Sequence, residues 1–239
     1  MYFDPLGTTW VQQITNLIKH QGQDDTKQLL ESVPWPDSAF IPMKVINEMP
    51  SPRIFKSHSP YHMMAGGLPH TSLAKYIYIA RNPKDTAVSF YYHMCGVIRR
   101  QYSQPWEHFF RLYMNGTVDF GLWFDHVLEW WKHRDAENIL FLKYEDMKKD
   151  HRGAVKKIAE FMGYNLMEEV IDMIVEKSTF QNMKENPGFS NKFRKPGAAF
   201  FRKGVVGDWR SHFTPQQNVE FDTVYAEKMK GSGLEFDLI

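Results

Sequence analysis

The chain has 239 residues, 43% of them hydrophobic and 15% aromatic, which is enough for one large domain with a substantial core. Its formal net charge of +1 excludes a general electrostatic attraction to nucleic acid or to an anionic membrane, so any basic site is local. Cys95 is the only cysteine, which excludes an intrachain disulfide and favours a reducing compartment. No apolar run approaches the roughly 20 residues of a transmembrane helix and no signal-peptide pattern is present, so we expect a cytoplasmic protein.

The first predicted helix follows a short strand stub in residues 1–6. Its apolar residues recur at the spacing of one helical face: Trp10, Ile14, Leu17 and Ile18. Gly7, Thr8 and Thr9 lie where this helix begins, and their backbone N–H groups and hydroxyls suit an oxyanion. The same three residues are also typical of a plain helix cap. Because the G-x-x-x-x-G-K-[ST] spacing of nucleotide triphosphatases is absent, a Walker-type enzyme is disfavoured.

A proline-punctuated connection over residues 23–52 leads to the next predicted strand, residues 53–57. The strand ends at His58, because a Ser-Pro pair immediately afterwards breaks regular structure. Alternation along a strand brings Lys56 and His58 to the same side of its carboxyl end. This pair suits a general base and a cationic stabiliser, although a histidine at a strand end is also a common hydrogen-bonded structural residue.

Residues 76–89 are typical of a buried strand that runs directly into a helix. Residues 76–80 are β-branched or aromatic, as in a parallel strand covered on both faces. Asn82 suits the helix N-cap, and a proline then suits the first helical position. Open α/β sheets bind ligands at the carboxyl ends of their strands, so Arg81 and Ser89 are candidates to bind an anion. The alternative is that Arg81 pairs with a neighbouring carboxylate and Ser89 touches nothing.

Further helices are predicted at residues 105–113, 120–132, 152–162 and 167–177. The first two are rich in aromatic residues and belong mainly to the core. Residues 138–144 form another predicted buried strand, which again places polar groups at a carboxyl end. Strands that alternate with helices predict an α/β fold with a parallel sheet, in a single domain over the whole chain.

Residues 181–204 show little periodicity and are predicted to form a loop longer than the roughly 12–15 residues usual in compact domains. The loop ends in two adjacent cations and a glycine, Arg202, Lys203 and Gly204, which let the backbone approach a phosphate. The alternative is a solvated basic turn. A last helix is predicted after a capping box at Thr214.

Taken in order, five separated motifs resemble those of the cytosolic sulfotransferase family across almost the whole chain. They are Gly-Thr-Thr-Trp at 7–10, Phe-Lys-Ser-His at 55–58, Ala-Arg-Asn-Pro-Lys-Asp at 80–85 with Ser89, Lys-Tyr-Glu-Asp-Met at 143–147, and Phe-Arg-Lys-Gly-Val-Val-Gly-Asp-Trp at 201–209. Each motif is weak alone, but their order is specific. The resemblance implies a doubly wound α/β fold, with a parallel sheet flanked by helices as in P-loop proteins. It also implies that 3'-phosphoadenylyl sulfate (PAPS), with no metal, gives its sulfuryl group to a small-molecule acceptor.

The resemblance also implies roles for individual residues. His58 would be the general base, and Lys56 would offset charge at the sulfuryl and bridging oxygens. The residues implied for the nucleotide are Gly7, Thr8, Thr9, Trp10, Arg81, Ser89, Tyr144, Ser178, Thr179, Phe180, Met183, Phe200, Phe201, Arg202, Lys203 and Gly204. Within this set the first loop would hold the 5'-phosphosulfate, and Arg81, Ser89 and residues 202–204 would bind the 3'-phosphate.

Three departures from the family pattern bear on activity and assembly. Pro5 stands where the family has a lysine that touches the bridging oxygen. The segment that normally precedes this loop, and that forms part of the acceptor wall, does not appear in the sequence. The family's dimer motif survives only as Arg210, Thr214, Pro215 and Val219, which predicts a monomer or a weak homodimer.

The leading hypothesis is a sulfotransferase for small apolar alcohols, phenols, steroids or arylamines, because aromatic and methionine side chains suit an apolar pocket. The competing class is a homologue that binds PAPS or its desulfonated product PAP with little or no transfer. A nucleoside phosphate kinase is a third hypothesis, and the missing Walker lysine counts against it.

Overall fold

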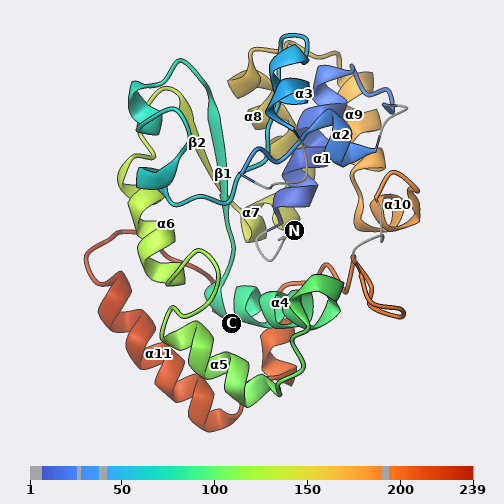
Figure 1. Ribbon diagram of the computed structural model, residues 1–239. Coiled ribbons are helices and arrows are strands. Elements are labelled where there is room, and N and C mark those ends of the chain that lie inside the picture. Colours follow the sequence, from blue (N-terminus) through green and yellow to red (C-terminus); the bar gives the residue numbers. More distant parts are fainter. Residues whose placement is uncertain (1–6, 26–27, 38–41, 190–193, 239) are drawn as a thin grey trace.

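A parallel sheet lies at the centre of the molecule, and in the described residues it has two strands (Figure 1). The structure is a computed structural model that describes residues 7–25, 28–37, 42–189 and 194–238. β1 (Tyr76–Ala80) pairs with β2 (Ile139–Lys143) along its whole length, and Ala80 lies opposite Lys143. Both strands therefore end at the same level, and the helices that follow them begin there.

Successive residues of each strand enter opposite cores, as the period of a strand requires. Tyr78 and Ala80 of β1 belong to one hydrophobic cluster, whereas Ile79 belongs to the other. In β2, Leu140 and Leu142 join the cluster of Ile79. Helices cover both faces of the sheet, with α6 on one side and α1, α8 and α9 on the other in Figure 1. The predicted α/β fold, a parallel sheet flanked by helices, is confirmed.

Four helices cover the face that carries Ile79: α1 (Thr8–Lys19), α7 (Tyr144–Lys149), α8 (His151–Met162) and α9 (Glu168–Lys177). The predicted apolar face of α1 is confirmed, because Ile14, Leu17 and Ile18 are fully buried. Each such side chain contributes about 1.5–3 kcal/mol when it is removed from water. This burial anchors α1, whose first turn reaches the end of the sheet.

Four other helices contribute residues to the hydrophobic cluster of Tyr78 and Ala80: α4 (Pro83–Gly96), α5 (Trp106–Met114), α6 (Trp123–Lys132) and α11 (Pro215–Met229). The predicted cap of α4 is confirmed, because Asn82 Oδ1 accepts the N–H groups of Lys84 at 2.9 Å and Asp85 at 3.3 Å. The predicted capping box of α11 is confirmed as well, with both bonds between Thr214 and Gln217 present.

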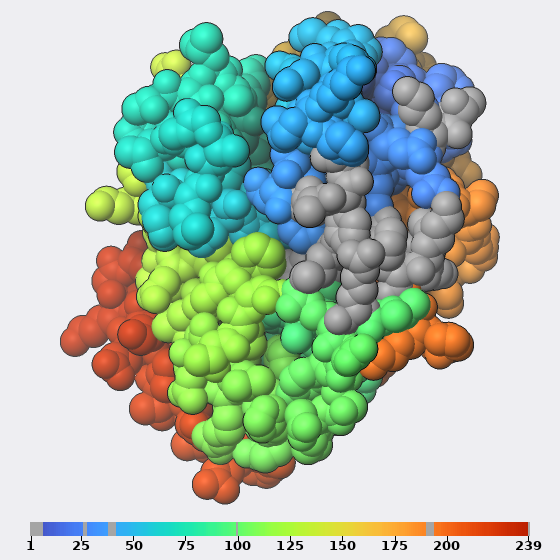
Figure 2. Space-filling view, in the orientation of Figure 1, coloured from blue at the N-terminus to red at the C-terminus, as the bar shows by residue number. Residues whose placement is uncertain are grey.

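Shorter elements connect these layers: α2 (Leu29–Ser32), α3 (Met43–Glu48), α10 (Phe180–Glu185), and the 3-10 turns η1 (Tyr61–Met63), η2 (Pro69–Thr71), η3 (Ile98–Arg100) and η4 (Asp208–Ser211). On the face shown in Figure 2, the segment between α3 and β1 (cyan) lies beside the region of α6 (yellow-green). Across the described ranges, every helix is too short or too polar to span a membrane.

The prediction of a strand over residues 53–57 is wrong, because these residues are irregular. The N–H of Lys56 donates to Pro34 O at 2.8 Å, so the segment pairs with another loop and not with the sheet. Two prolines shortly before it have no N–H to offer to a strand ladder. The predicted alternation nevertheless holds, since Lys56 and His58 are both buried.

Two element boundaries also differ from the predictions. The loop predicted over residues 181–204 begins with α10, because the Thr179 hydroxyl caps this helix by accepting the N–H of Asn182 at 3.3 Å. The helix predicted to start at residue 120 begins at Trp123. Phe120 has a φ of 67°, which lies outside the helical region.

Candidate active site

Arg81 and Tyr144 meet at the shared end of the two strands. They directly follow β1 and β2, and the guanidinium carbon of Arg81 lies 4.6 Å from the centre of the Tyr144 ring. Arg81 Nη2 donates to Val205 O at 2.9 Å and lies 3.8 Å from Asp85 Oδ2. Arg81 therefore has a neighbouring carboxylate, as the alternative interpretation expected, and it also lies at the edge where an α/β sheet binds ligands.

Only glycine fits at position 7, where α1 begins. Gly7 has a φ of 92°, and a Cβ added there would lie 2.6 Å from the Tyr144 ring and 3.3 Å from the Ile79 side chain. The N-terminus of α1 is thus held against the ring that also stacks on Arg81. The Gly-Thr-Thr-Trp motif and the Arg81 motif share one edge of the sheet.

A buried carboxylate fixes residues 201–209, which we call the basic segment, over the start of α4. Asp85 is 1% exposed, its Oδ2 accepts the N–H of Gly207 at 2.7 Å, and its Oδ1 accepts that of Trp209 at 3.0 Å. Ser89 is partly exposed one helical turn beyond Asp85. Sequence reasoning missed this role of Asp85, because no local pattern signals a partner more than 120 positions away. We call residues 7–10, Arg81, Tyr144 and the basic segment together the anion edge.

The two cations of the basic segment share a second carboxylate. Arg202 Nη1 and Lys203 Nζ both donate to Asp208, the lysine at 2.5 Å, and the Asp208 side chain is only 6% exposed. Burial acts to raise the pKa of Asp208, but the hydrogen bonds from the two cations outweigh burial and hold the pKa below its usual range. The guanidinium of Arg202 also lies 4.7 Å from the centre of the Tyr92 ring. The other N–H groups of both cations suit a phosphate.

Aromatic rings pack behind the basic segment. Gly204 has a φ of 67°, and a Cβ added there would lie 2.2 Å from the Phe180 ring, so this position also requires glycine. The Phe180 ring centre lies 5.9 Å from that of Phe201, which lies 5.0 Å from that of Phe200. Met183 of α10 is buried. The structure brings together four aromatic or glycine positions that the family resemblance assigns to the nucleotide.

A histidine links Ser178 to Trp10, because His151 hydrogen-bonds to Ser178 and packs against the Trp10 ring. The Ser178 hydroxyl donates to Ile174 O at 2.6 Å, so its oxygen accepts from His151 Nε2 at 2.9 Å. The His151 ring lies 4.9 Å from the Trp10 ring, which lies 5.5 Å from the Tyr144 ring. Burial is the largest cause that lowers the pKa of His151 to about 4, which keeps the imidazole neutral. The hydroxyl proton of Ser178 therefore already takes part in a hydrogen bond within the protein.

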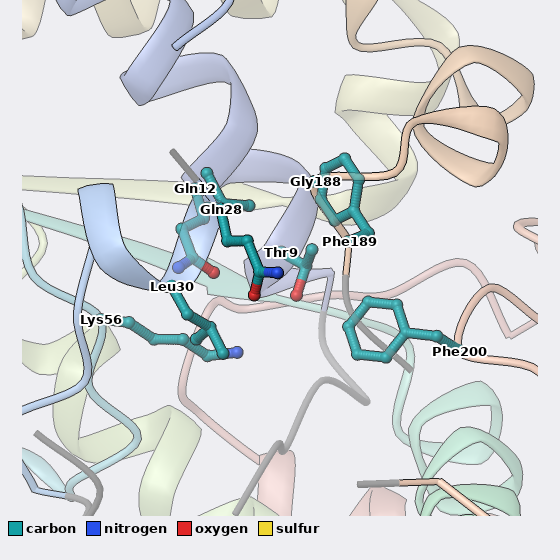
Figure 3. A pocket seen from close by; sticks show the side chains of 9 residues that line it. Thr9, Gln12, Gln28, Leu30, Lys56, Gly188, Phe189 and Phe200 are labelled. Carbon is teal, nitrogen blue, oxygen red and sulfur yellow. The ribbon is translucent and has the colours of Figure 1, made fainter. Parts of the chain in front are cut away.

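Two of the predicted motifs, through Thr9 and Lys56, meet at one small pocket beside Phe200 (Figure 3). Its lining residues are Thr9, Gln12, Gln28, Leu29, Leu30, Lys56, Gly188, Phe189 and Phe200. Among them Lys56 is the one cation, and its ammonium lies 5.9 Å from the Trp35 ring. Burial lowers the pKa of nearby His93 to about 2, together with the charges of Arg194 and Lys56. Lys56 is thus a buried cation in the pocket wall, and such a cation suits an anion.

A cavity of about 1000 Å³, the large cavity, opens beside Lys56 and His58. Aromatic rings in its wall include Tyr78, Phe90, Tyr113, Phe120, Trp123 and Trp130. His58 is 6% exposed, and its ring centre lies 5.0 Å from that of Trp35 and 5.5 Å from that of Phe120. Such a wall, with a buried histidine and lysine at one point, suits a small apolar molecule that reacts there.

Pro5 and the strand stub predicted in residues 1–6 lie outside the described residues. Within the ranges that are described, no group of histidine, cysteine, aspartate and glutamate side chains could hold a metal ion.

An electropositive edge next to an apolar cavity with a buried histidine defines an enzyme class: group transfer from an anionic donor to an apolar acceptor. The family model for the sulfotransferase domain matches residues 6–233. The chain therefore belongs to the sulfotransferase family, and the resemblance of its motifs is confirmed.

Individual relatives agree with this family. The chain is 41% identical over 246 residues to Sulfotransferase 1C2 of Rattus norvegicus, covering 96% of this chain and 82% of that protein. It is 39% identical over 241 residues to the Amine sulfotransferase of Oryctolagus cuniculus, covering 96% and 79%. The structure of mouse sulfotransferase SULT7A1 complexed with PAP matches with a TM-score of 0.77 at 33% identity, over 95% of this chain and 81% of that one. A retinol dehydratase complexed with androsterone and the inactive cofactor PAP shares the fold, with a TM-score of 0.84 at 23% identity over 100% and 85%.

Proposed function

We propose that the protein transfers the sulfuryl group of PAPS to a hydroxyl or amine of a small apolar acceptor: a phenol, a steroid or other alcohol, or an arylamine. One observation carries the proposal. Lys56 lines both the small pocket beside Thr9 and the large cavity beside His58, so an anionic donor and an apolar acceptor would meet there. The PAP complex of the 33% identical mouse sulfotransferase supports the same nucleotide.

In the proposed reaction the acceptor oxygen or nitrogen attacks the sulfur of PAPS. The new bond to sulfur forms as the bond between sulfur and the bridging oxygen breaks, and PAP leaves with the electron pair. His58 would accept the proton of the acceptor, since its imidazole lies at the wall of the large cavity. Lys56 would offset the charge that develops on the sulfuryl and bridging oxygens.

The anion edge would hold the nucleotide through groups that do not change during transfer. We assign the 5'-phosphosulfate to the backbone of residues 7–9, and the 3'-phosphate to Arg81, Ser89 and residues 202–204. The other groups assigned to the nucleotide pocket are Trp10, Tyr144, Ser178, Thr179, Phe180, Met183, Phe200 and Phe201. The contacts of Tyr144 with Gly7 and Arg81 support a single continuous pocket.

We also propose that the protein is a monomer or a weak homodimer in the cytoplasm. Pro215 occupies the first position of α11 and offers no N–H to a pairing segment, and Val219 is 66% exposed on the same helix. The single cysteine, Cys95, suits a reducing compartment. Sedimentation at micromolar concentration tests the assembly state, and a tight dimer would contradict it.

A transfer assay with radiolabelled PAPS tests the function. The acceptor panel contains phenols, steroids and arylamines, and calorimetric titration measures PAP binding in parallel. We expect binding together with transfer to at least one acceptor class. Binding without transfer to any acceptor would instead identify a nucleotide-binding homologue, and turnover of ATP with no transfer from PAPS would identify a kinase.

A further inference from the structure

A chain of hydrogen bonds runs from β1 through α6 to the backbone of the proposed base. The Tyr78 hydroxyl lies 2.9 Å from His126 Nδ1, and His126 Nε2 lies 3.1 Å from His58 O. Tyr78 is 8% exposed, and its ring stacks on that of His126 with centres 5.7 Å apart. All three residues line the large cavity. The chain thus joins partners that are 48 and 68 positions apart in the sequence.

Elementary hydrogen-bond chemistry sets the direction of this chain. A backbone carbonyl only accepts, so His126 Nε2 must carry the proton that it donates to His58 O. In the neutral imidazole the other nitrogen, Nδ1, is then an acceptor, and the Tyr78 hydroxyl is its donor. Burial lowers the pKa of His126 and raises the pKa of Tyr78, so the neutral imidazole and the protonated hydroxyl are both favoured.

The position of residues 53–58, which carry His58, depends on the hydrogen bond from His126 more than the position of a strand would. Residues 53–58 are irregular and belong to no strand ladder in the described sheet. The bond from His126 acts on the main chain of His58 itself, while Trp35 and Phe120 pack against its ring. The direction of the carbonyl and the packing of the ring together determine where the imidazole points.

We propose that His126 is a positioning residue for sulfuryl transfer and that Tyr78 sets its tautomer. His126 exchanges no proton with the acceptor; it donates to His58 O and so holds the proposed base at one place in the large cavity. This inference rests on the proposed function, in which His58 accepts the acceptor's proton. A displacement of about 1 Å can cost about a hundredfold in rate. Loss of the hydrogen bond from His126 to His58 O would therefore lower kcat.

Three variants separate positioning from stability. Tyr78→Phe keeps the ring and removes the hydroxyl donor, and we expect kcat to fall about tenfold with an unchanged KM for PAPS. His126→Leu removes both bonds, and we expect a fall of about a hundredfold. His126→Gln keeps an N–H that can donate to His58 O and an oxygen that can accept from Tyr78. We expect its kcat to lie within about threefold of wild type.

Tyr225→Phe is the matched control. The Tyr225 hydroxyl accepts the N–H of Phe236 at 3.1 Å, and Tyr225 lies on α11, outside the described wall of the large cavity. This variant also removes one partly buried hydroxyl, so we expect a similar change in Tm with no change in kcat. Equal kcat values for Tyr78→Phe and Tyr225→Phe would overturn the proposal. A His126→Gln variant no faster than His126→Leu would overturn it as well.

A measurement without turnover distinguishes this inference from the proposed function. In protein with nitrogen-15-labelled histidine, long-range correlation spectra report which nitrogen of His126 carries the proton, and the His126→Gln spectrum assigns the signal. We expect the Nε2–H tautomer. An Nδ1–H tautomer would overturn the inference even in an active enzyme. If the wild type transfers to no acceptor, the proposed function fails, while an Nε2–H tautomer still supports the hydrogen-bond chain.

Discussion

The anion edge and the large cavity adjoin each other but are built in opposite ways. At the anion edge, polar bonds join segments that are far apart in sequence: Asp85 accepts from Gly207 and Trp209, and Arg81 donates to Val205. The large cavity is bordered by aromatic rings and by the irregular segment before β1. A phosphate has one geometry, and a fixed polar frame suits it. An apolar acceptor varies in shape, and a roomy aromatic wall suits that variety.

This difference predicts that substitutions in the two regions damage different properties. At the anion edge they should lower stability and nucleotide affinity, because the same carboxylates hold the fold and orient the cations. At the large cavity they should lower turnover, because His58, as the proposed base, would act only in the transition state. The following predictions test this separation, from the largest expected effect to the smallest.

Asp85→Ala should have the largest effect, and it should act on stability. The change leaves Arg81 without its buried carboxylate and leaves two backbone N–H groups without an acceptor. Removal of one partner from such a buried pair costs about 3–5 kcal/mol. Urea unfolding of the variant, with Asp85→Asn as the control of equal size, measures the loss. If the loss of unfolding free energy is no greater than for substitution of an exposed aspartate, Asp85 does not hold the anion edge together.

His58→Ala should act on turnover and not on nucleotide affinity. Loss of a general base lowers the rate by about a hundredfold or more, whereas affinity for PAP should stay nearly intact. Initial rates and calorimetric titration measure the two properties. His62→Ala is the control, because it removes a side chain that is 61% exposed in the nearby 3-10 turn η1. Full turnover in His58→Ala would refute the proposed base.

Arg202→Ala should show the reverse pattern. Its contact with a phosphate would be the same in the ground and transition states, so its loss should weaken PAP binding by about 1.5–3 kcal/mol, the contribution of one charged hydrogen bond. Turnover at saturating PAPS should fall less. Arg134→Ala removes the same charge beside Trp131, in the connection between α6 and β2, and should leave PAP affinity unchanged. Equal losses of affinity in His58→Ala and Arg202→Ala would remove the distinction between the two regions.

Asp208→Asn should have the smallest effect, about 1 kcal/mol of stability at neutral pH, because asparagine keeps an acceptor for Arg202 and Lys203. The pKa of Asp208 is lowered in the folded protein from its ordinary value of 3.8. Its ionic contribution is therefore fully present above that ordinary value and is lost as the pH falls through the lowered pKa. Tm curves of wild type and variant should run apart at neutral pH and converge below pH 3.8. Tm curves that stay parallel below pH 3.8 would contradict this ionic contribution of Asp208 to stability.

Local signals explain which parts of the fold are predictable from the sequence. The caps at Asn82 and Thr214 are predictable because each side chain bonds to an N–H two or three residues away. The apolar face of α1 is predictable because its apolar residues recur at the spacing of one helical face. The strand over residues 53–57 is predicted wrongly, since alternation is identical in a strand and in an extended segment whose partner is another loop.

The candidate site also has features that local sequence signals predict and features that they do not. Residue types and spacing indicate the motifs with Lys56, His58 and Arg81, so an anion site at the sheet edge is predictable. Nothing local indicates that Asp85 holds the basic segment or that His126 bonds to the main chain of His58. These partners meet only through tertiary folding, and one sequence without the fold contains no signal for them.

The bonds from Asp85 to Gly207 and Trp209 also bear on how the protein is made. They span 122 and 124 positions, so a growing polypeptide carries their acceptor long before their donors are translated. At roughly 5–20 residues per second, the sheet and the helices on one of its faces can form first on the ribosome. Contacts of such high sequence separation close late, after the local elements. Nucleotide affinity is therefore a property of the finished chain, and a nascent chain that stops before residue 207 should contain the sheet yet fail to bind PAP.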